Sequence, residues 1–412
     1  MPHSRVAVCL LVAVSTVSCS SLLSASPEVS GDLRPTVAPT ATQAQPVPSV
    51  VAMTPTPSVS SVPATSPSAP LPSGSPAATP PNVPLSPAPS VIDSVLIGTQ
   101  VWPVEWNDDG SALIAVDQTP GTSIVHVFDA DGHEIWSTSA ITAAWTGADS
   151  LAFLRKSDTT PDLIDLFEVK LPSGAPTQVQ GSYLNFITPA ANGRLAVPTS
   201  ETPRGFTFDL LNPAGGHFDG EPLLWSPAAD KLAIIRGSAT HSGFLAIVDA
   251  ASGSVTRTRL DVAEDGLAFD RSGSKLMACV YGNEGNCIPT LVAQDGTEIV
   301  ASVMRGELLG AGELPDGRWV GGNPAFGVVV WDPNEPATTT SLGTGWSSVS
   351  PTGTVAIIGD ATVAPANIGP EVALVQLPGS GDSYPVWSPA GDLIAYSVLS
   401  ASGQELRIAR VP

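Results

Sequence analysis

Two acidic turns are the first candidates for chemistry in this sequence. Asp129-Ala130-Asp131-Gly132 and Asn107-Asp108-Asp109-Gly110 carry closely spaced oxygen ligands of the kind that bind calcium. Neither run has the glutamate that closes a calcium loop at its twelfth position, and Asp, Asn and Gly are also the residues expected in tight turns. We therefore interpret both runs as turns and predict no metal site.

The histidines show no catalytic or metal-binding pattern. His126, His133, His217 and His241 are scattered, and none has the HxH or HExxH spacing of zinc ligands. The sequence has no GxSxG nucleophile motif and no glycine-rich phosphate loop after a strand. We predict no catalytic residue and no cofactor.

The charge of the chain argues against nucleic acid as a partner. The sequence has 17 lysines and arginines against 38 aspartates and glutamates, a formal net charge of −21. A surface that binds nucleic acid needs a basic patch to hold phosphates. The acidity indicates solubility instead, and it disfavours direct adsorption to anionic lipid.

A repeated motif organises residues 92–412. It places an aromatic or apolar residue before a tight turn and an alternating apolar run after it. The clearest copies are VEWNDDGSALIAV (104–116), LLWSPAADKLAII (223–235), LAFDRSGSKLMAC (267–279), SSVSPTGTVAIIG (347–359) and YPVWSPAGDLIAYSV (384–398), and weaker copies lie at 143–155, 187–199 and 312–322. The copies recur about every 40 residues, which is typical of four-stranded propeller blades.

Each copy predicts the two inner strands, A and B, of one blade. Proline sets the first central position of a type I turn, and glycine takes the left-handed position that lets strand B leave antiparallel to strand A. A large flat side chain before the turn can fill the wedge between blades, at Trp106, Trp145, Trp225, Phe269 and Trp387. Hairpin patterns at 124–139, 244–260, 289–303 and 327–342 predict the outer strands, C and D.

The two ends of this region predict a closed ring. The last copy supplies strands A and B and then a strand C at 405–411, and SVLIGTQ (94–100) precedes the first copy. We expect 94–100 to pair with 405–411 as the missing strand D, so that no sheet edge stays unpaired. The sequence predicts an all-β fold, a single propeller of about eight four-stranded antiparallel blades, with seven as the alternative because the copies at 187–199 and 312–322 are weak.

Two cysteines of the folded region predict a disulfide. Cys279 ends strand B and Cys287 begins strand C of the same predicted blade, in CVYGNEGNC. The two residues should therefore face each other across a short hairpin loop, and disulfides persist in exported proteins. Two free buried thiols are the alternative.

The N-terminal residues predict export. A basic start at His3 and Arg5 precedes an apolar run at 6–14, far shorter than the roughly 20 residues of a spanning helix. Ser18-Cys19 then resembles a bacterial lipobox, in which the cysteine is lipidated and begins the mature chain. The resemblance implies a signal peptide at 1–18 and an anchor at Cys19 on the outer face of the cytoplasmic membrane. Cleavage after Ala25 and free secretion are the alternative.

A disordered tether is predicted at 19–91, ahead of the propeller at 92–412. Residues 24–90 are dominated by Pro, Ser, Thr, Ala and Val and include no aromatic residue. Such a segment cannot bury enough apolar surface to offset the entropy of ordering.

Two copies of the motif resemble a known family. VWSPAGDLIAYS (386–397) and LLWSPAADKLAII are similar to the WD40-like repeats of TolB proteins of the bacterial envelope, and the tethered layout resembles propeller lipoproteins of high-GC Gram-positive bacteria. The resemblance implies a propeller, an envelope location and protein binding as the commonest family role. TolB proteins have an α/β domain where this chain has the tether, so the specific partners of TolB are not implied. VFDADGHEIWST (127–138) resembles a repeat of pyrroloquinoline-quinone dehydrogenases, which keeps such an enzyme as an alternative.

We predict a binding or scaffold module rather than an enzyme. An envelope protein is expected to dock on the face that carries the connections from strand B to strand C and those between blades, which we call the B–C face. Its segments are longer and more varied than the turns of the other face, at 155–162, 198–205, 237–243 and 359–371, with 360–370 as the most protruding. A small molecule or glycan bound in the propeller channel is the alternative.

Overall fold

The computed structural model describes residues 90–98, 100–119, 121–160, 163–202, 205–213, 215–237, 242–282, 286–359, 372–379, 381, 385–401 and 403–411. All of them belong to one compact unit. Helices are missing from this part of the chain, so it contains none that could cross a membrane. The signal peptide, Cys19, the tether and loop 360–370 lie outside the described residues.

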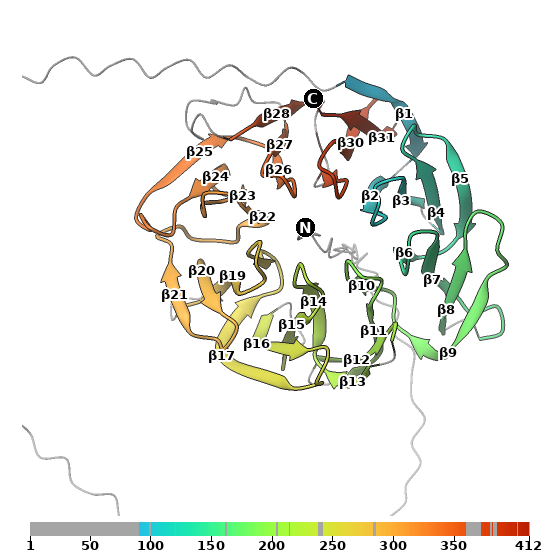
Figure 1. The fold of residues 1–412 in the computed structure, drawn as a ribbon, viewed down its shortest axis with the longest axis horizontal. Helices are drawn as coiled ribbons and strands as arrows, with labels where there is room; N and C mark the ends of the chain where they lie inside the picture. Colours follow the sequence, from blue (N-terminus) through green and yellow to red (C-terminus); the bar gives the residue numbers. More distant parts are fainter. Residues whose placement is uncertain are drawn as a thin grey trace, which may run out of the picture. The chain divides into compact units, whose positions relative to one another are not determined.

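The described strands form sheets that follow one another in chain order around a ring (Figure 1). From the inner strand outward, the first three meanders are β2 (Val101–Trp106), β3 (Ala112–Thr119), β4 (Thr122–Asp129), β5 (Glu134–Ser139); β6 (Thr142–Trp145), β7 (Ser150–Lys156), β8 (Ile164–Lys170), β9 (Thr177–Tyr183); and β10 (Thr188–Pro189), β11 (Leu195–Thr202), β12 (Gly205–Leu211), β13 (Gly216–Asp219). The next three are β14 (Glu221–Trp225), β15 (Lys231–Arg236), β16 (Ser242–Asp249), β17 (Val255–Ala263); β18 (Ala268–Phe269), β19 (Lys275–Tyr281), β20 (Cys287–Ala293), β21 (Glu298–Ala301); and β22 (Leu309–Glu313), β23 (Trp319–Asn323), β24 (Gly327–Trp331), β25 (Thr339–Gly343). The last two are β26 (Trp346–Val349), β27 (Val355–Ile358), β28 (Leu374–Leu377); and β29 (Val386–Trp387), β30 (Leu393–Ser400), β31 (Gly403–Arg410), β1 (Ser90–Gly98). This is the all-β propeller that the repeats predict.

The number of blades stays a prediction. The two meanders from β14 to β21 form one continuous sheet, because Val262 on β17 pairs with Val280 on β19. The sheet from β26 to β28 contains three strands, and residues 360–371 before β28 are outside the described part.

One strand runs in the direction opposite to the one predicted. β28 pairs with β27 in parallel, with Val355 opposite Leu374 and Ile358 opposite Leu377. The prediction of four antiparallel strands is therefore wrong for this sheet. A parallel pair needs a connection that returns along the whole strand, and residues 359–373 provide the length. The end of β28 then leads directly to β29, the inner strand of the next sheet.

The ring closes as predicted, through an N-terminal strand. β1 pairs antiparallel with β31, with Ile92 opposite Ile408 and Leu96 opposite Leu406 (Figure 1). Next to this seam, Gln404 Oε1 accepts a hydrogen bond of 2.7 Å from the backbone N–H of Val101 on β2. The first strand of the fold is thus bound to the last, which leaves no free edge on β31.

The core lies between neighbouring sheets. One buried cluster combines residues 112–127 of the first sheet with residues 143–171 of the second, and a similar cluster joins each later pair. The tryptophans before the turns cross these interfaces: Trp145 Nε1 donates to Glu105 O (3.3 Å), Trp225 Nε1 to Thr188 O (2.9 Å) and Trp387 Nε1 to Ser348 O (3.4 Å). The predicted wedge role of these side chains is therefore confirmed.

Candidate interaction surface

The predicted loops of the B–C face are partly strand. β11 extends to Thr202 and β12 begins at Gly205, so the prediction of a long loop at 198–205 is wrong. Hydroxyls continue the pairing here, since Thr199 Oγ1 lies 3.0 Å from Thr207 Oγ1 on the opposite strand. The connection predicted at 155–162 is observed at 157–163, between β7 and β8. The Ser157 N–H closes it by donating a hydrogen bond of 2.9 Å to the Leu163 carbonyl.

A disulfide holds one hairpin of the B–C face. Cys279 at the end of β19 and Cys287 at the start of β20 are joined, with their Cα atoms 5.2 Å apart, which matches the predicted pairing. Both cysteines are buried. The carbonyl of Cys287 also accepts a hydrogen bond of 2.9 Å from the N–H of Gly306, in the connection to the next sheet. The disulfide therefore fixes a hairpin on which a neighbouring connection rests.

Acidic side chains gather around this hairpin. Burial raises the pKa of the Glu307 carboxyl, and the charge of Asp265 raises it further. The pKa of the Tyr281 phenol is also raised, first by burial and then by the charges of Glu307, Asp261 and Asp265. The charge of Asp265 thus acts on Glu307, and the charges of all three carboxylates act on Tyr281, in the region between β17 and β22. Arg305 lies in the same connection as Glu307.

Exposed apolar side chains concentrate on the same face. In the described ranges, the large ones are Ile135, Leu163, Phe244, Ile299, Val303, Phe326 and Leu399. Leu163, Phe244, Val303, Phe326 and Leu399 lie in or within three residues of connections on the B–C face, whereas Ile135 and Ile299 lie on outer strands. Exposed apolar groups beside a polar rim are typical of interaction surfaces. Sequence reasoning missed them, although an apolar residue inside a turn, as in NPAFG (323–327), is a usable signal.

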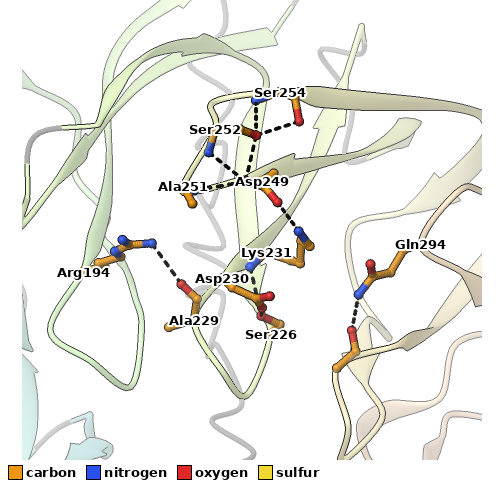
Figure 2. Close-up of polar contacts among 11 residues, drawn as sticks. Arg194, Ser226, Ala229, Asp230, Lys231, Asp249, Ala251, Ser252, Ser254 and Gln294 are labelled. Atoms are coloured by element: carbon orange, nitrogen blue, oxygen red, sulfur yellow. Dashed lines mark hydrogen bonds and ion pairs between the residues drawn. The ribbon is translucent and has the colours of Figure 1, made fainter.

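The opposite face is made of turns whose polar side chains bond to their own backbone (Figure 2). Asp249 Oδ1 accepts hydrogen bonds from the N–H groups of Ala251 (3.1 Å) and Ser252 (2.8 Å), and its Oδ2 pairs with Lys231 Nζ. The Lys231 ammonium and these donors hold the pKa of Asp249 far below its usual value. Ser226 Oγ similarly accepts from the Lys231 N–H at 3.0 Å.

The two turns first considered for calcium belong to this opposite face. Asp129 Oδ1 accepts from the N–H groups of Asp131 (3.0 Å) and His133 (2.8 Å), and Asn107 Oδ1 accepts from Ala112 N–H (3.0 Å). Their oxygens thus stabilise the turns. In the part of the chain that the structure describes, no three His, Cys, Asp or Glu side chains are grouped as a metal ion requires.

Each histidine that the structure describes lies beside a carboxylate, including His133, whose Nδ1 is 3.1 Å from Asp129 Oδ2. His126 Nδ1 lies 2.6 Å from Glu134 Oε2, between β4 and β5, and His217 Nδ1 lies 2.7 Å from Asp209 Oδ1, between β12 and β13. His241 is outside the described residues.

Comparison with known proteins supports the fold. No protein-family model matches the sequence, and no curated protein matches it either. Among solved structures, the chain is similar to the propeller of Dos1, with 11% identity and a TM-score of 0.50 over 79% of this chain and 95% of that one. It is also similar to oligogalacturonate lyase from Vibrio parahaemolyticus (10% identity, TM-score 0.43, 80% of this chain and 93% of that one) and to TolB from Acinetobacter baumannii (14%, 0.35, 71% and 78%). At these identities the likeness concerns the fold alone, which is a β-propeller.

Proposed function

We propose that this protein is a TolB-like envelope lipoprotein whose propeller binds another protein on the B–C face. The observation that carries the proposal is the asymmetry between the two faces. Among the residues that the structure describes, five of the seven exposed large apolar side chains lie at the B–C face, while polar side chains in turns of the other face bond to the backbone of those turns. Removing exposed apolar surface from water is the main favourable term in protein association.

The role proposed is binding rather than catalysis. Asp129 and Asn107, which the sequence suggested as metal ligands, accept hydrogen bonds from backbone N–H groups of their own turns. The disulfide-held hairpin and its neighbouring connection provide a rigid support for recognition, because preorganised surfaces lose less entropy on binding.

The envelope location rests on the N-terminal sequence. The apolar run at 6–14, Ser18-Cys19 and the Pro/Ser/Thr-rich segment support a lipid anchor at Cys19 and a tether that holds the propeller away from the membrane. The alternative is secretion without an anchor, and cell fractionation distinguishes the two.

Fractionation of the host cell tests the anchor. We expect wild-type protein in the membrane fraction and the Cys19→Ala variant outside it, with the Cys9→Ala variant as the control. Equal partitioning of wild type and Cys19→Ala would reject the lipoprotein.

Crosslinking in the native envelope tests the binding role. A photoreactive residue at Phe326, on the B–C face, should crosslink to a protein, whereas the same residue at Ile299, on an outer strand, should not. Equal labelling from both positions, or recovery of only a glycan or small molecule, would reject a protein-binding face.

A further inference from the structure

Three of the exposed apolar side chains lie along consecutive meanders of the ring, from β16 to the connection before β24. Phe244 is 55% exposed at the start of β16, Val303 is 63% exposed in the connection between β21 and β22, and Phe326 is 53% exposed in the connection between β23 and β24. A side chain of this kind costs free energy while it faces water, by roughly 25 cal/mol for each Å² of apolar surface. All three lie at the B–C face, and backbone pairing and hydrogen bonds connect the segments that carry them.

Backbone pairing connects Phe244 to the disulfide hairpin. Phe244 lies opposite Asp261 in the ladder between β16 and β17. The next residue of β17, Val262, pairs with Val280 on β19, and Tyr281 then pairs with Cys287. Phe244 and the acidic side chain beside it are therefore continuous with the hairpin that the disulfide holds.

Hydrogen bonds connect the hairpin to Phe326. The N–H of Gly306 donates to the carbonyl of Cys287, which places the connection carrying Val303 and Glu307 against the hairpin. The side chain of Asn323, 3% exposed, donates from Nδ2 to the carbonyls of Arg305 (3.1 Å) and Glu307 (3.0 Å). Its Oδ1 accepts from the N–H of Phe326 at 3.2 Å. One buried amide thus links the acidic connection to the turn that presents Phe326.

The resulting surface, which we call the apolar-acidic strip, consists of Phe244, Asp261, Asp265, Tyr281, Val303, Glu307 and Phe326. Its carboxylates are placed by the backbone: Asp261 lies opposite Phe244, and Glu307 follows Gly306, whose N–H donates to the carbonyl of Cys287. Two basic residues lie beside the three carboxylates of the strip: Arg305 in the same connection as Glu307, and Arg236 opposite Phe244 in the ladder between β15 and β16. A negative strip on a chain of net charge −21 repels an anionic partner and attracts a cationic one.

We propose that the apolar-acidic strip binds a cationic segment of the partner protein, in which lysine or arginine alternates with aliphatic or aromatic residues. The apolar residues of the segment would cover Val303 and Phe326, and its ammonium or guanidinium groups would face Asp261 and Glu307. This inference rests on the proposed function and adds the chemistry of the partner.

Selection from a library of short random peptides tests that chemistry directly. The full-length protein is immobilised, and the selected peptides are then measured against wild type, a Val303→Ser/Phe326→Ser variant and an Asp261→Asn/Glu307→Gln variant. Matched controls come from β21, where Ile299 is exposed and Glu298 precedes it: Ile299→Ser and Glu298→Gln. Thermal melting of each variant confirms that the fold is intact, which is expected because the replaced apolar groups are exposed.

We expect enriched peptides to contain Lys or Arg next to apolar residues. Loss of the two apolar anchors should weaken binding at least about tenfold, while both control variants should bind within about twofold of wild type. Raising the salt from about 50 to about 500 mM should weaken binding to wild type markedly and to the Asp261→Asn/Glu307→Gln variant less. Enrichment of acidic or neutral peptides, or equal binding to the site and control variants, would overturn the proposal.

The crosslink from Phe326 separates this inference from the function on which it rests. A crosslinked protein whose attached segment is rich in Lys or Arg supports both. A crosslinked protein attached through an acidic or neutral segment rejects the cationic partner and keeps the binding face. The absence of a protein crosslink rejects both.

Discussion

The indole Nε1 of Trp106 donates a hydrogen bond to the carbonyl oxygen of Val386 at 3.1 Å, although the two residues are 280 positions apart. The bond joins β2, the inner strand of the first sheet, to β29, the inner strand of the last. Trp145, Trp225 and Trp387 make the same bond to the sheet before their own. The tryptophans thus link neighbouring sheets along the inner strands, and Trp106 makes this bond across the seam where the chain ends meet.

Replacing Trp106 tests the value of that bond. Trp106→Phe keeps most of the ring and loses the donor, so we expect the free energy of unfolding to fall by about 1 kcal/mol. Trp106→Ala also leaves a cavity and should cost about 3 to 5 kcal/mol. Urea unfolding measures both, and Phe269, which stands at the matching position of another sheet, shows that a phenyl ring fits there. Equal losses for the two variants would mean that the ring volume contributes nothing.

Removal of β1 tests the closure. Deleting residues 1–98 exposes the edge of β31, and we expect a lower melting temperature and aggregation, because an unpaired edge strand invites pairing with another chain. Deletion of residues 1–89 is the control and should leave melting unchanged. If both truncated proteins melt alike, β1 does not stabilise the ring.

Reduction of the disulfide should destabilise the propeller. The bond closes a loop between cysteines separated by 8 positions, so the Cys279→Ser/Cys287→Ser variant should lose about 2 to 3 kcal/mol of unfolding free energy. Alkylation of the unreduced, denatured protein checks the bond itself. Modification of both thiols under those conditions would show that they are free.

Asp249 and Lys231 give a pH-dependent contribution to stability. The pKa of Asp249 is lowered in the folded protein, so its stabilisation is complete above the pKa of an unfolded aspartate, near about 4, and is lost as the pH falls below that value. Asp249→Asn should therefore be less stable than wild type at neutral pH, by about 1 kcal/mol, and the gap should narrow near pH 2. Urea unfolding at the two pH values measures it, with Glu298→Gln, at an exposed position of β21, as the control. A gap that stays constant with pH would contradict the assignment.

Local features of this protein could be read from the sequence. The inner hairpins depend on turn residues and on alternation over a few positions, as at Ser388 to Gly391, so the motif alone predicts them. Cys279 and Cys287 are close in sequence and flank one hairpin, so the local sequence is enough to predict their disulfide. The closure by 94–100 followed from a missing strand in the last blade, and β1 confirms it.

The direction of β28 and the composition of the apolar-acidic strip were decided only by the tertiary structure. The alternation of VALVQL (372–377) is the same for a parallel and an antiparallel neighbour, so the alternation alone does not determine the direction of β28. Phe244, Glu307 and Phe326 are distant in sequence, and the segments that carry them are connected by the Val262–Val280 pair and by the Asn323 amide. The turn code acts over a few residues, whereas a binding surface is assembled from several sheets, and only the packing of those sheets brings its side chains together.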